Sequence, residues 1–133
     1  MSYGVAAALQ AALITRLQSS AEVTVPVFDA SVFGEMPETY VQLGSEEARA
    51  RNDKTGRGAE HRVSISVVTS LPGFAAAKAQ AVAVSDALDG ADLPLSRGRL
   101  VDIWFERAVA RRDEGEGHTR RVDLRFHARV EDN

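Results

Sequence analysis

The chain has 133 residues, of which 44% are hydrophobic and 26% charged, a composition that fits one globular domain with one core. Its 16 basic and 19 acidic residues give a net charge of −3, so the overall charge attracts neither nucleic acid nor an anionic membrane. The absence of cysteine excludes disulfides, thiolate zinc sites and cysteine nucleophiles. The apolar N-terminus lacks a basic flank and is interrupted by Gln10 and Arg16, so we expect a soluble, unprocessed protein.

The stretch before Gly44 predicts one helix and two strands. Ser2 can cap a helix that runs to about Ser20, because an apolar residue recurs every four positions along one face. Only Arg16 is charged in this helix, which is compatible with burial between the sheet and a neighbouring element or with a subunit interface. Valines alternate with polar residues at 23–27, and Pro26 places this short strand at a sheet edge. The stretch 39–43 predicts a second strand.

The segment 44–60 shows no apolar periodicity. It contains eight charged residues and three glycines, so we predict a long loop, and such loops in compact domains are usually functional or disordered. The stretch 54–58 superficially resembles a phosphate-binding loop, but it lacks the glycine spacing before the lysine and leads into a strand. A basic loop that docks on an acidic partner is the better interpretation. The candidate contact residues are Arg49, Arg51, Lys54 and Arg57.

The second half of the chain predicts strand, helix and hairpin in turn. Alternation over 61–70 indicates a third strand, an apolar stripe over 74–88 indicates a second helix, and Gly90 is placed to end that helix. The stretch 99–131 predicts a hairpin, with glycines in its turn. The element order is therefore α-β-β-β-α-β-β. It suggests a single α+β domain over residues 1–133, with a mostly antiparallel sheet of about five strands and both helices on one face.

The final strand has the clearest pattern in the chain. Strict alternation over 121–130 predicts a half-buried strand. The residues expected to face the core are Val122, Leu124, Phe126, Ala128 and Val130, and those expected to face water or another protein are Arg121, Asp123, Arg125, His127 and Arg129.

No catalytic or metal-binding set emerges from the sequence. The three histidines, His61, His118 and His127, are not at ligand spacing, so solvated or interface positions are the default expectation. Paired carboxylates across the hairpin could do acid–base work, but arginines lie among them and cross-strand ion pairs explain the same pattern without catalysis. These carboxylates are Asp102, Glu106 and Asp123.

Nine arginines fall between Arg97 and Arg129, but carboxylates nearly balance them, which favours a protein-binding surface over nucleic acid. Trp104 is predicted on the outer face of its strand if Val101, Ile103 and Phe105 face the core. It would then be an anchor for another subunit. A bulge, or a sheet covered on both sides, would instead make Trp104 an ordinary packed residue.

Four segments together resemble a family of tail-completion proteins found in long-tailed phages and in the gene transfer agents of alphaproteobacteria. They are YGVAAALQAAL at 3–13, KTGRGAEHRV at 54–63, DALDG at 86–90 and TRRVDLRFHARV at 119–130. The resemblance spans nearly the whole chain. It rests on the order of these segments and on their general residue pattern, since the family has no catalytic signature. It implies a tail terminator: a hexameric ring on the last ring of the tail tube, which stops tube polymerisation and offers its other face to the head-side connector.

The resemblance implies a structural protein of the particle neck, assembled in the host cytoplasm, with no enzymatic activity and no cofactor. Its partners would be copies of itself, the tail tube protein and a connector or stopper protein, with DNA passing transiently and no membrane contact. We expect Trp104 to contact another subunit. Axial or lateral docking is expected at the hairpin tip, and the final strand could line a subunit boundary or the lumen. The hairpin-tip residues are Arg111, Arg112, Glu114 and Glu116, and those of the strand are Arg121, Arg125 and Arg129. A small ligand-binding α+β domain and a nucleic-acid-binding module are the alternatives.

Overall fold

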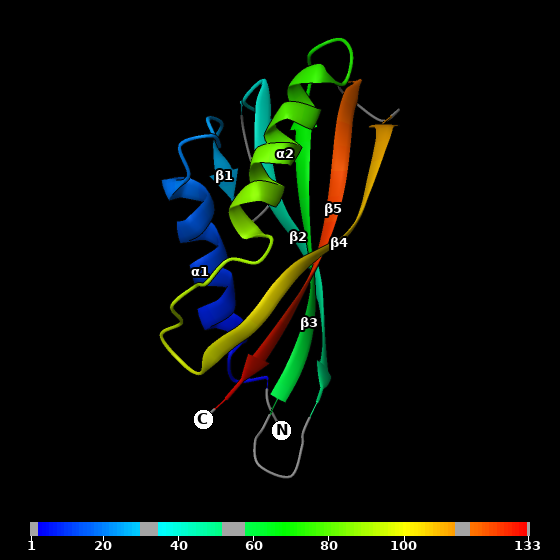
Figure 1. Cartoon of the computed structure of the whole chain (residues 1–133). Coiled ribbons are helices and arrows are strands. Elements are labelled where there is room, and N and C mark those ends of the chain that lie inside the picture. The colour runs from blue at the N-terminus through cyan, green and yellow to red at the C-terminus, as the bar shows by residue number, and fades with distance from the viewer. Residues whose placement is uncertain (1–2, 30–34, 52–57, 114–117, 133) are drawn as a thin grey trace.

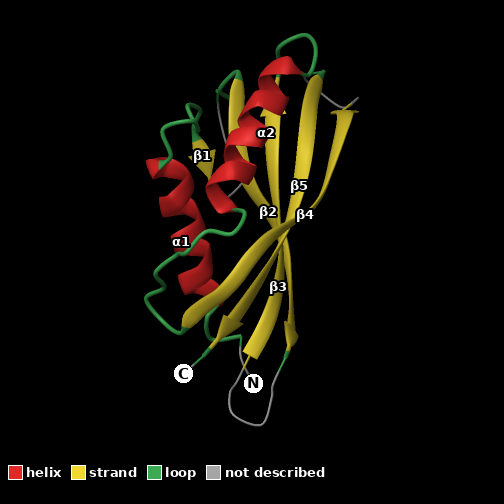
Figure 2. Ribbon diagram, viewed as in Figure 1, coloured by secondary structure: helices red, strands yellow, loops and turns green. Residues whose placement is uncertain are grey.

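The computed structural model describes residues 3–29, 35–51, 58–113 and 118–132. Its elements are α1 (Ala6–Ser19), β1 (Val27–Phe28), β2 (Thr39–Ala50), β3 (Gly58–Thr69), α2 (Ala75–Leu88), β4 (Arg99–Asp113) and β5 (Thr119–Glu131). The five strands form one sheet in the order β1-β2-β3-β5-β4, in which only β1 and β2 pair in parallel. Both helices lie on one side of this strongly twisted sheet (Figures 1 and 2). The predicted α+β class and element order are confirmed.

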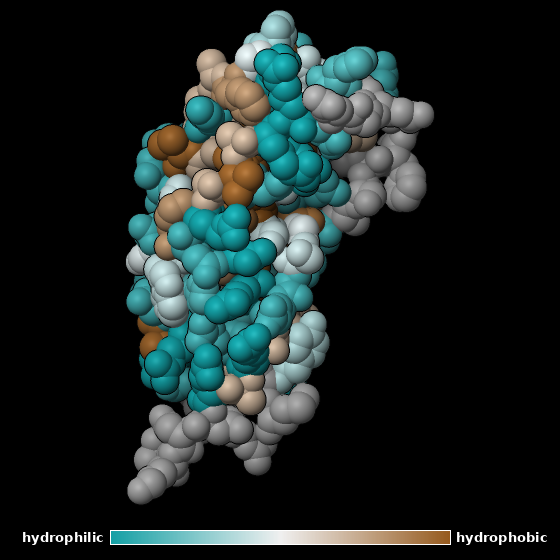
Figure 3. All heavy atoms as spheres, turned by 90° about the vertical axis from the view of Figure 1, so that its right-hand side faces the viewer, coloured by the Kyte–Doolittle hydropathy of each residue, from teal (hydrophilic) through white to brown (hydrophobic). Residues whose placement is uncertain are grey.

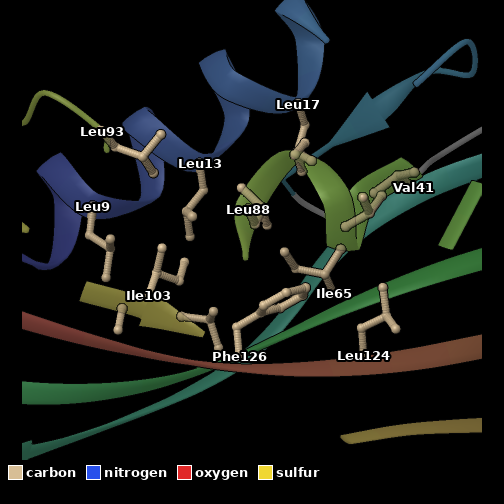
Figure 4. Close-up of a cluster of buried hydrophobic side chains, with 14 of the residues drawn as sticks. Leu9, Leu13, Leu17, Val41, Ile65, Leu88, Leu93, Ile103, Leu124 and Phe126 are labelled. Atoms are coloured by element: carbon tan, nitrogen blue, oxygen red, sulfur yellow. The ribbon is translucent and has the colours of Figure 1, made fainter. Parts of the chain in front are cut away.

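The core lies between the helices and the two central strands. The five residues of β5 that the alternation assigns to the core are buried, and Phe126 is fully enclosed. From β3, Ile65 faces the same layer, and α1 covers it with Leu9, Leu13 and Leu17 (Figure 4). The predicted core faces therefore pack against each other. Every second residue of the strands and every fourth residue of α1 is apolar, and these side chains lie in one layer.

The first helix begins later than its sequence suggests. Val5 precedes the first helical residue and no side chain caps the helix. The prediction of Ser2 as the cap is wrong, because a capping residue directly precedes the first turn and the helix begins only at Ala6. Along its side the helix is joined to α2, since Arg16 Nε donates to the carbonyl of Ala87 at 2.8 Å. Its opposite side, which includes Ala7 and Ala11, is exposed within the single chain.

The second helix ends as predicted. It follows Phe74, and Gly90 comes directly after the final cap residue with φ +70°, a left-handed conformation that glycine adopts without steric cost. The Gly90 amide donates to the carbonyl of Ile103 at 2.7 Å, which ties the end of α2 to β4. None of the helices described is long and apolar enough to cross a membrane.

The predicted loop over 44–60 is wrong for most of its length. Strand β2 continues to Ala50 and β3 begins at Gly58, with Glu47 opposite Arg62 and Arg49 opposite Glu60. The apolar alternation is missing because the second half of β2 lies at the sheet edge and most of its residues are exposed. A bulge between Leu43 and Glu46 further interrupts its pattern. The strand expected over 23–27 is likewise reduced to Val27–Phe28, although it lies at the edge as predicted.

Candidate interaction surface

The sheet face that points away from the helices, here called the open face, is predominantly polar. Register places Ser66 opposite Asp123, Ser64 opposite Arg125, and Arg62 opposite His127, which in turn faces Trp104 on β4. Viewed from the right-hand side of Figure 1, the molecule is largely hydrophilic with smaller hydrophobic patches (Figure 3). The polar half of the β5 alternation therefore lies where the sequence predicts.

A carboxylate–histidine cluster occupies the centre of the open face. His127 Nδ1 lies 2.6 Å from Glu60 Oε1, and its Nε2 lies 2.8 Å from Glu106 Oε1. When both ring nitrogens carry protons, the ring donates to a carboxylate on each side and so links β3, β5 and β4. Hydrogen bonding to His127 is the main cause that lowers the pKa of Glu60 and of Glu106, and Arg51 contributes at Glu60. Although the sequence suggests a solvated or interface histidine, His127 is only 7% exposed.

Trp104 lies on the open face, as predicted. Its indole stacks on His127 with ring centroids 5.2 Å apart and an interplanar angle of 18°, and the residue remains 36% exposed. The assignment of its neighbours to the core is confirmed only for Ile103, because Val101 and Phe105 are 40% and 39% exposed. Bulges at Leu100/Asp102 and Phe105/Arg107 interrupt β4, and its outer half extends along the sheet edge. Trp104 is therefore outward as predicted, and the bulges that β4 does contain do not turn it into a fully packed residue.

A second network surrounds Asp123. Its carboxylate accepts hydrogen bonds from Ser66 at 2.6 Å and from Arg111 and Arg121 at 3.0 Å each. Burial alone would raise the pKa of Asp123, but these three donors outweigh it and leave the pKa below its ordinary value. Cross-strand ion pairs thus account for this carboxylate as the sequence suggested.

The other two carboxylates of the possible acid–base set are separately engaged. Glu106 is bound to His127 and lies 3.8 Å from Arg125 Nε, and Asp102 accepts the amide of Ile103. Each carboxylate of the set therefore belongs to a different local arrangement. In the described ranges, no group of three or more histidine, aspartate or glutamate residues is arranged to hold a metal ion.

The candidate contact residues divide into bound and unbound arginines. Arg49 pairs with Glu47 at 2.8 Å and Arg51 with Glu60 at 3.2 Å, so both cations lie against carboxylates at the end of β2. Arg129 is exposed and, like Arg112, makes no ion pair with another described residue. The described part of the chain also leaves Arg62 and Arg107 without an ion pair. The candidates Lys54, Arg57, Glu114 and Glu116 lie outside the described residues.

His61 is an internal residue that sequence reasoning missed. It is fully buried on the helix side of the sheet, where its Nδ1 lies 2.7 Å from Glu46 Oε1 and its ring stacks on Tyr3 at 6.2 Å. Its Nε2 has no hydrogen-bond partner among the described atoms. The signal that could have revealed it is its register within the β3 alternation, which places it on the same face as Val63 and Ile65.

Two surface hollows are lined mainly by charged and polar residues. One of about 250 Å³ lies at the β2 bulge and is lined by Ser45, Glu47, Arg62 and Arg125 among others. Another of about 370 Å³ lies at the hairpin tip, with Arg112, His118 and Arg120 in its wall. Charged side chains thus line these hollows, which suits contact with a polar protein surface.

Comparison with known proteins identifies the family. Over residues 11–131 the chain matches the model of the family described as "Tail completion protein gp17". It is also similar to a chain in a solved structure described as "Virion of native gene transfer agent (GTA) particle", with 55% identity and a TM-score of 0.89. That match covers 98% of this chain and 99% of the other. No curated protein matches. The chain belongs to the tail completion protein gp17 family.

Proposed function

We propose that this protein is a tail terminator, which forms a hexameric ring at the head-proximal end of the tail tube of a phage-like particle. The observation that carries the proposal is the full-length likeness to a chain of a native gene transfer agent virion, together with the family match. A structural role in a phage-like particle follows from the family. The ring, its position and its sixfold symmetry are the proposed steps.

The proposed mechanism is steric and requires no covalent step. One axial side of the ring matches the last ring of tail tube protein, and the other side lacks the surface that would recruit a further tube ring. That second side instead binds the connector or stopper protein on the head. Because each subunit needs two lateral and two axial contacts, a protein of this size uses a large share of its surface for assembly.

Three features of the surface support an assembly role. Trp104 presents a supported aromatic ring, and tryptophan and arginine are enriched among the residues that dominate interface energetics. Arg111 and Arg112 lie near the hairpin tip, where an axial or lateral neighbour can reach them. Arg125 and Arg129 point to the open face, and if that face lines the lumen they meet passing DNA without reading its sequence.

The test is deletion of the gene in the producing cells, followed by electron microscopy of the released particles. We expect overlong tails, or tails that fail to join heads, with rescue when the wild-type gene is supplied in trans. A density map of wild-type particles should place a ring of this fold between the tube and the head connector. Tails of normal length joined to heads in the deletion strain would overturn the proposal.

A further inference from the structure

Two edges of the sheet carry backbone groups without a strand partner. Strand β4 is the last strand on one side of the sheet. On the other side, β1 pairs only with Val41 and Gln42, so the rest of β2 has no neighbouring strand among the described residues. Unpaired edges of this length are templates for pairing with another chain.

The free part of β4 is its outer half. Before the bulge at Phe105/Arg107, the backbone groups of β4 that point away from β5 already have partners. The amide of Gly90 donates to the carbonyl of Ile103, and the carboxylate of Asp89 accepts the amide of Phe105. The bulge adds one residue to β4, so beyond it the even-numbered residues, instead of the odd-numbered ones, have backbone groups that point away from β5. Beyond it, the outward backbone groups are those of Ala108, Ala110 and Arg112, in a stretch whose residues are all exposed.

The free part of β2 is its second half. The amide of Val41 points outward to the carbonyl of Pro26, and the amide of Arg51 points inward to the carbonyl of Gly58. Backbone groups of successive strand residues point alternately toward β3 and away from it. Since the amide of Arg51 points toward β3, the N–H and C=O groups that point away from β3 are those of Glu46, Ala48 and Ala50. The small alanines at both free edges leave room for another strand.

We propose that the outer half of β4 in one copy pairs with the second half of β2 in the next copy, antiparallel and with Ala110 opposite Ala48. This inference rests on the proposed ring and names its lateral contact. The occupant is a second copy of this chain because the two free edges match in direction, in length and in charge.

Charge selects the register. With Ala110 opposite Ala48, Arg111 lies opposite Glu47 and Arg112 opposite Glu46, so two arginines meet two carboxylates. Within one copy Arg111 already pairs with Asp123, Glu47 with Arg49 and Glu46 with His61, so the contacts between copies extend these pairs into a shared network. The outer half of β4 has three arginines and one aspartate over 107–113, whereas 44–50 has two glutamates and one arginine. In this register Arg107 faces Arg51, but Arg51 is past the end of β2 and is bound to Glu60.

The neighbouring registers are worse. Outward groups alternate, so the register can shift only in steps of two residues. One shift places Arg107 opposite Arg49 within β2 and leaves Glu46 and Glu47 opposite alanine and valine. The other places Arg111 opposite Arg49 and Asp113 opposite Glu47, so like charges meet twice.

Strand direction is compatible with a ring. Successive pairs β2–β3, β3–β5 and β5–β4 are antiparallel, so β4 and β2 of one copy run in opposite directions. A head-to-tail junction therefore continues the antiparallel sheet with all helices on one side, and such heterologous contacts form a ring when the rotation from copy to copy closes. The free half of β4 lies at the hairpin-tip end and that of β2 at the opposite end (Figure 1). Successive copies are then staggered, as tilted strands in a closed barrel require.

The test is disulfide trapping in assembled particles. Val109 and Arg49 are opposite each other in this register, on the open face, at a pair whose Cα atoms should lie about 4.5 Å apart. The chain has no native cysteine, so any disulfide between two copies of the V109C/R49C variant joins introduced residues. After oxidation we expect a non-reducing gel to show a ladder of linked subunits that ends at the ring size. The two single variants should remain monomeric.

Specific results would overturn the pairing. Linked dimers in V109C alone would show that β4 pairs with β4, and stronger linkage in V109C/E47C would assign another register. Particles that contain the ring but no linkage in V109C/R49C would reject this contact while leaving the proposed function intact. Wild-type particles without a ring would instead reject the proposed function, and this contact with it.

A backbone substitution gives an independent test. Ala110→Pro removes an amide that points away from β5, which an edge strand tolerates within one chain, whereas Ala110→Val keeps that amide. We expect both variants to be folded by circular dichroism, and at least a tenfold lower incorporation into particles for the proline variant only. Equal incorporation of the two variants would overturn the pairing.

Discussion

At Trp104, one face of the indole rests on the imidazole of His127 and the rest of the ring remains partly exposed. The imidazole is fixed in turn by Glu60 and Glu106, from strands on either side of β5. A large aromatic ring held this firmly loses little conformational entropy when a partner covers it. A partner that covers Trp104 would therefore meet a ring that is already ordered.

We predict that Trp104→Ala weakens self-association more than it weakens the fold. Loss of the stacked pair and of the buried part of the ring should cost about 1–2 kcal/mol of unfolding free energy. Incorporation into particles should fall at least tenfold, because a central aromatic anchor contributes about 2 kcal/mol or more to an interface. Urea denaturation and quantification of particle-bound protein measure the two effects. A large loss of stability in a domain that still assembles when folded would make Trp104 ordinary core.

At the scale of elements, the central strand β5 carries the fold. Phe126 is fully buried, and its ring meets that of Phe105 edge-on with centroids 6.0 Å apart. Figure 4 shows it in the layer between the sheet and the helices, near Ile65 and Ile103. Since β5 pairs with β3 on one side and β4 on the other, a cavity at this residue affects the packing of the whole sheet.

We predict that Phe126→Ala lowers the free energy of unfolding by about 3–5 kcal/mol, through lost burial and the cavity left behind. Val82→Ala on α2 is the matched control, because Val82 is 59% exposed and should change stability by less than about 0.5 kcal/mol. Urea titrations of both variants measure the difference. Similar midpoints for the two would contradict the placement of Phe126 in the core.

The sequence predicted β5, the hairpin and both helices because each has one face packed against the core. It did not predict the second half of β2, where neither face is covered and the strand is defined by pairing with β3 alone. The cluster at His127 was missed for a related reason. Alternation tells which face His127 occupies, but the bulge at Glu106 determines which side chains surround it, and nothing in the local sequence marks that bulge.

At the scale of the whole molecule, charge is organised by face. Among the described residues, four carboxylates have a lowered pKa, and all four lie on the open face of the sheet: Glu47, Glu60, Glu106 and Asp123. Each is hydrogen-bonded to an arginine or to His127. Some of these pairs join neighbouring strands, and others join two residues of the same strand. The helix side is held mainly by apolar packing, so the two faces should respond differently to pH.

We predict that acid destabilises the protein through the open face. A carboxylate whose pKa is lowered by folding contributes stability that is present above its unfolded pKa, ordinarily 4.5 for glutamate and 3.8 for aspartate, and is lost as pH falls through the lower folded value. The free energy of unfolding should therefore fall steadily below about pH 5. Urea titrations between pH 7 and pH 3 measure it.

Glu60→Gln and Glu106→Gln should lower the free energy of unfolding at pH 7 and flatten its pH dependence, because they remove the carboxylates that bind His127. Glu35→Gln, at an exposed residue outside this cluster, should leave the dependence unchanged. A wild-type protein equally stable at pH 3 and pH 7 would mean that these ion pairs add nothing to the fold.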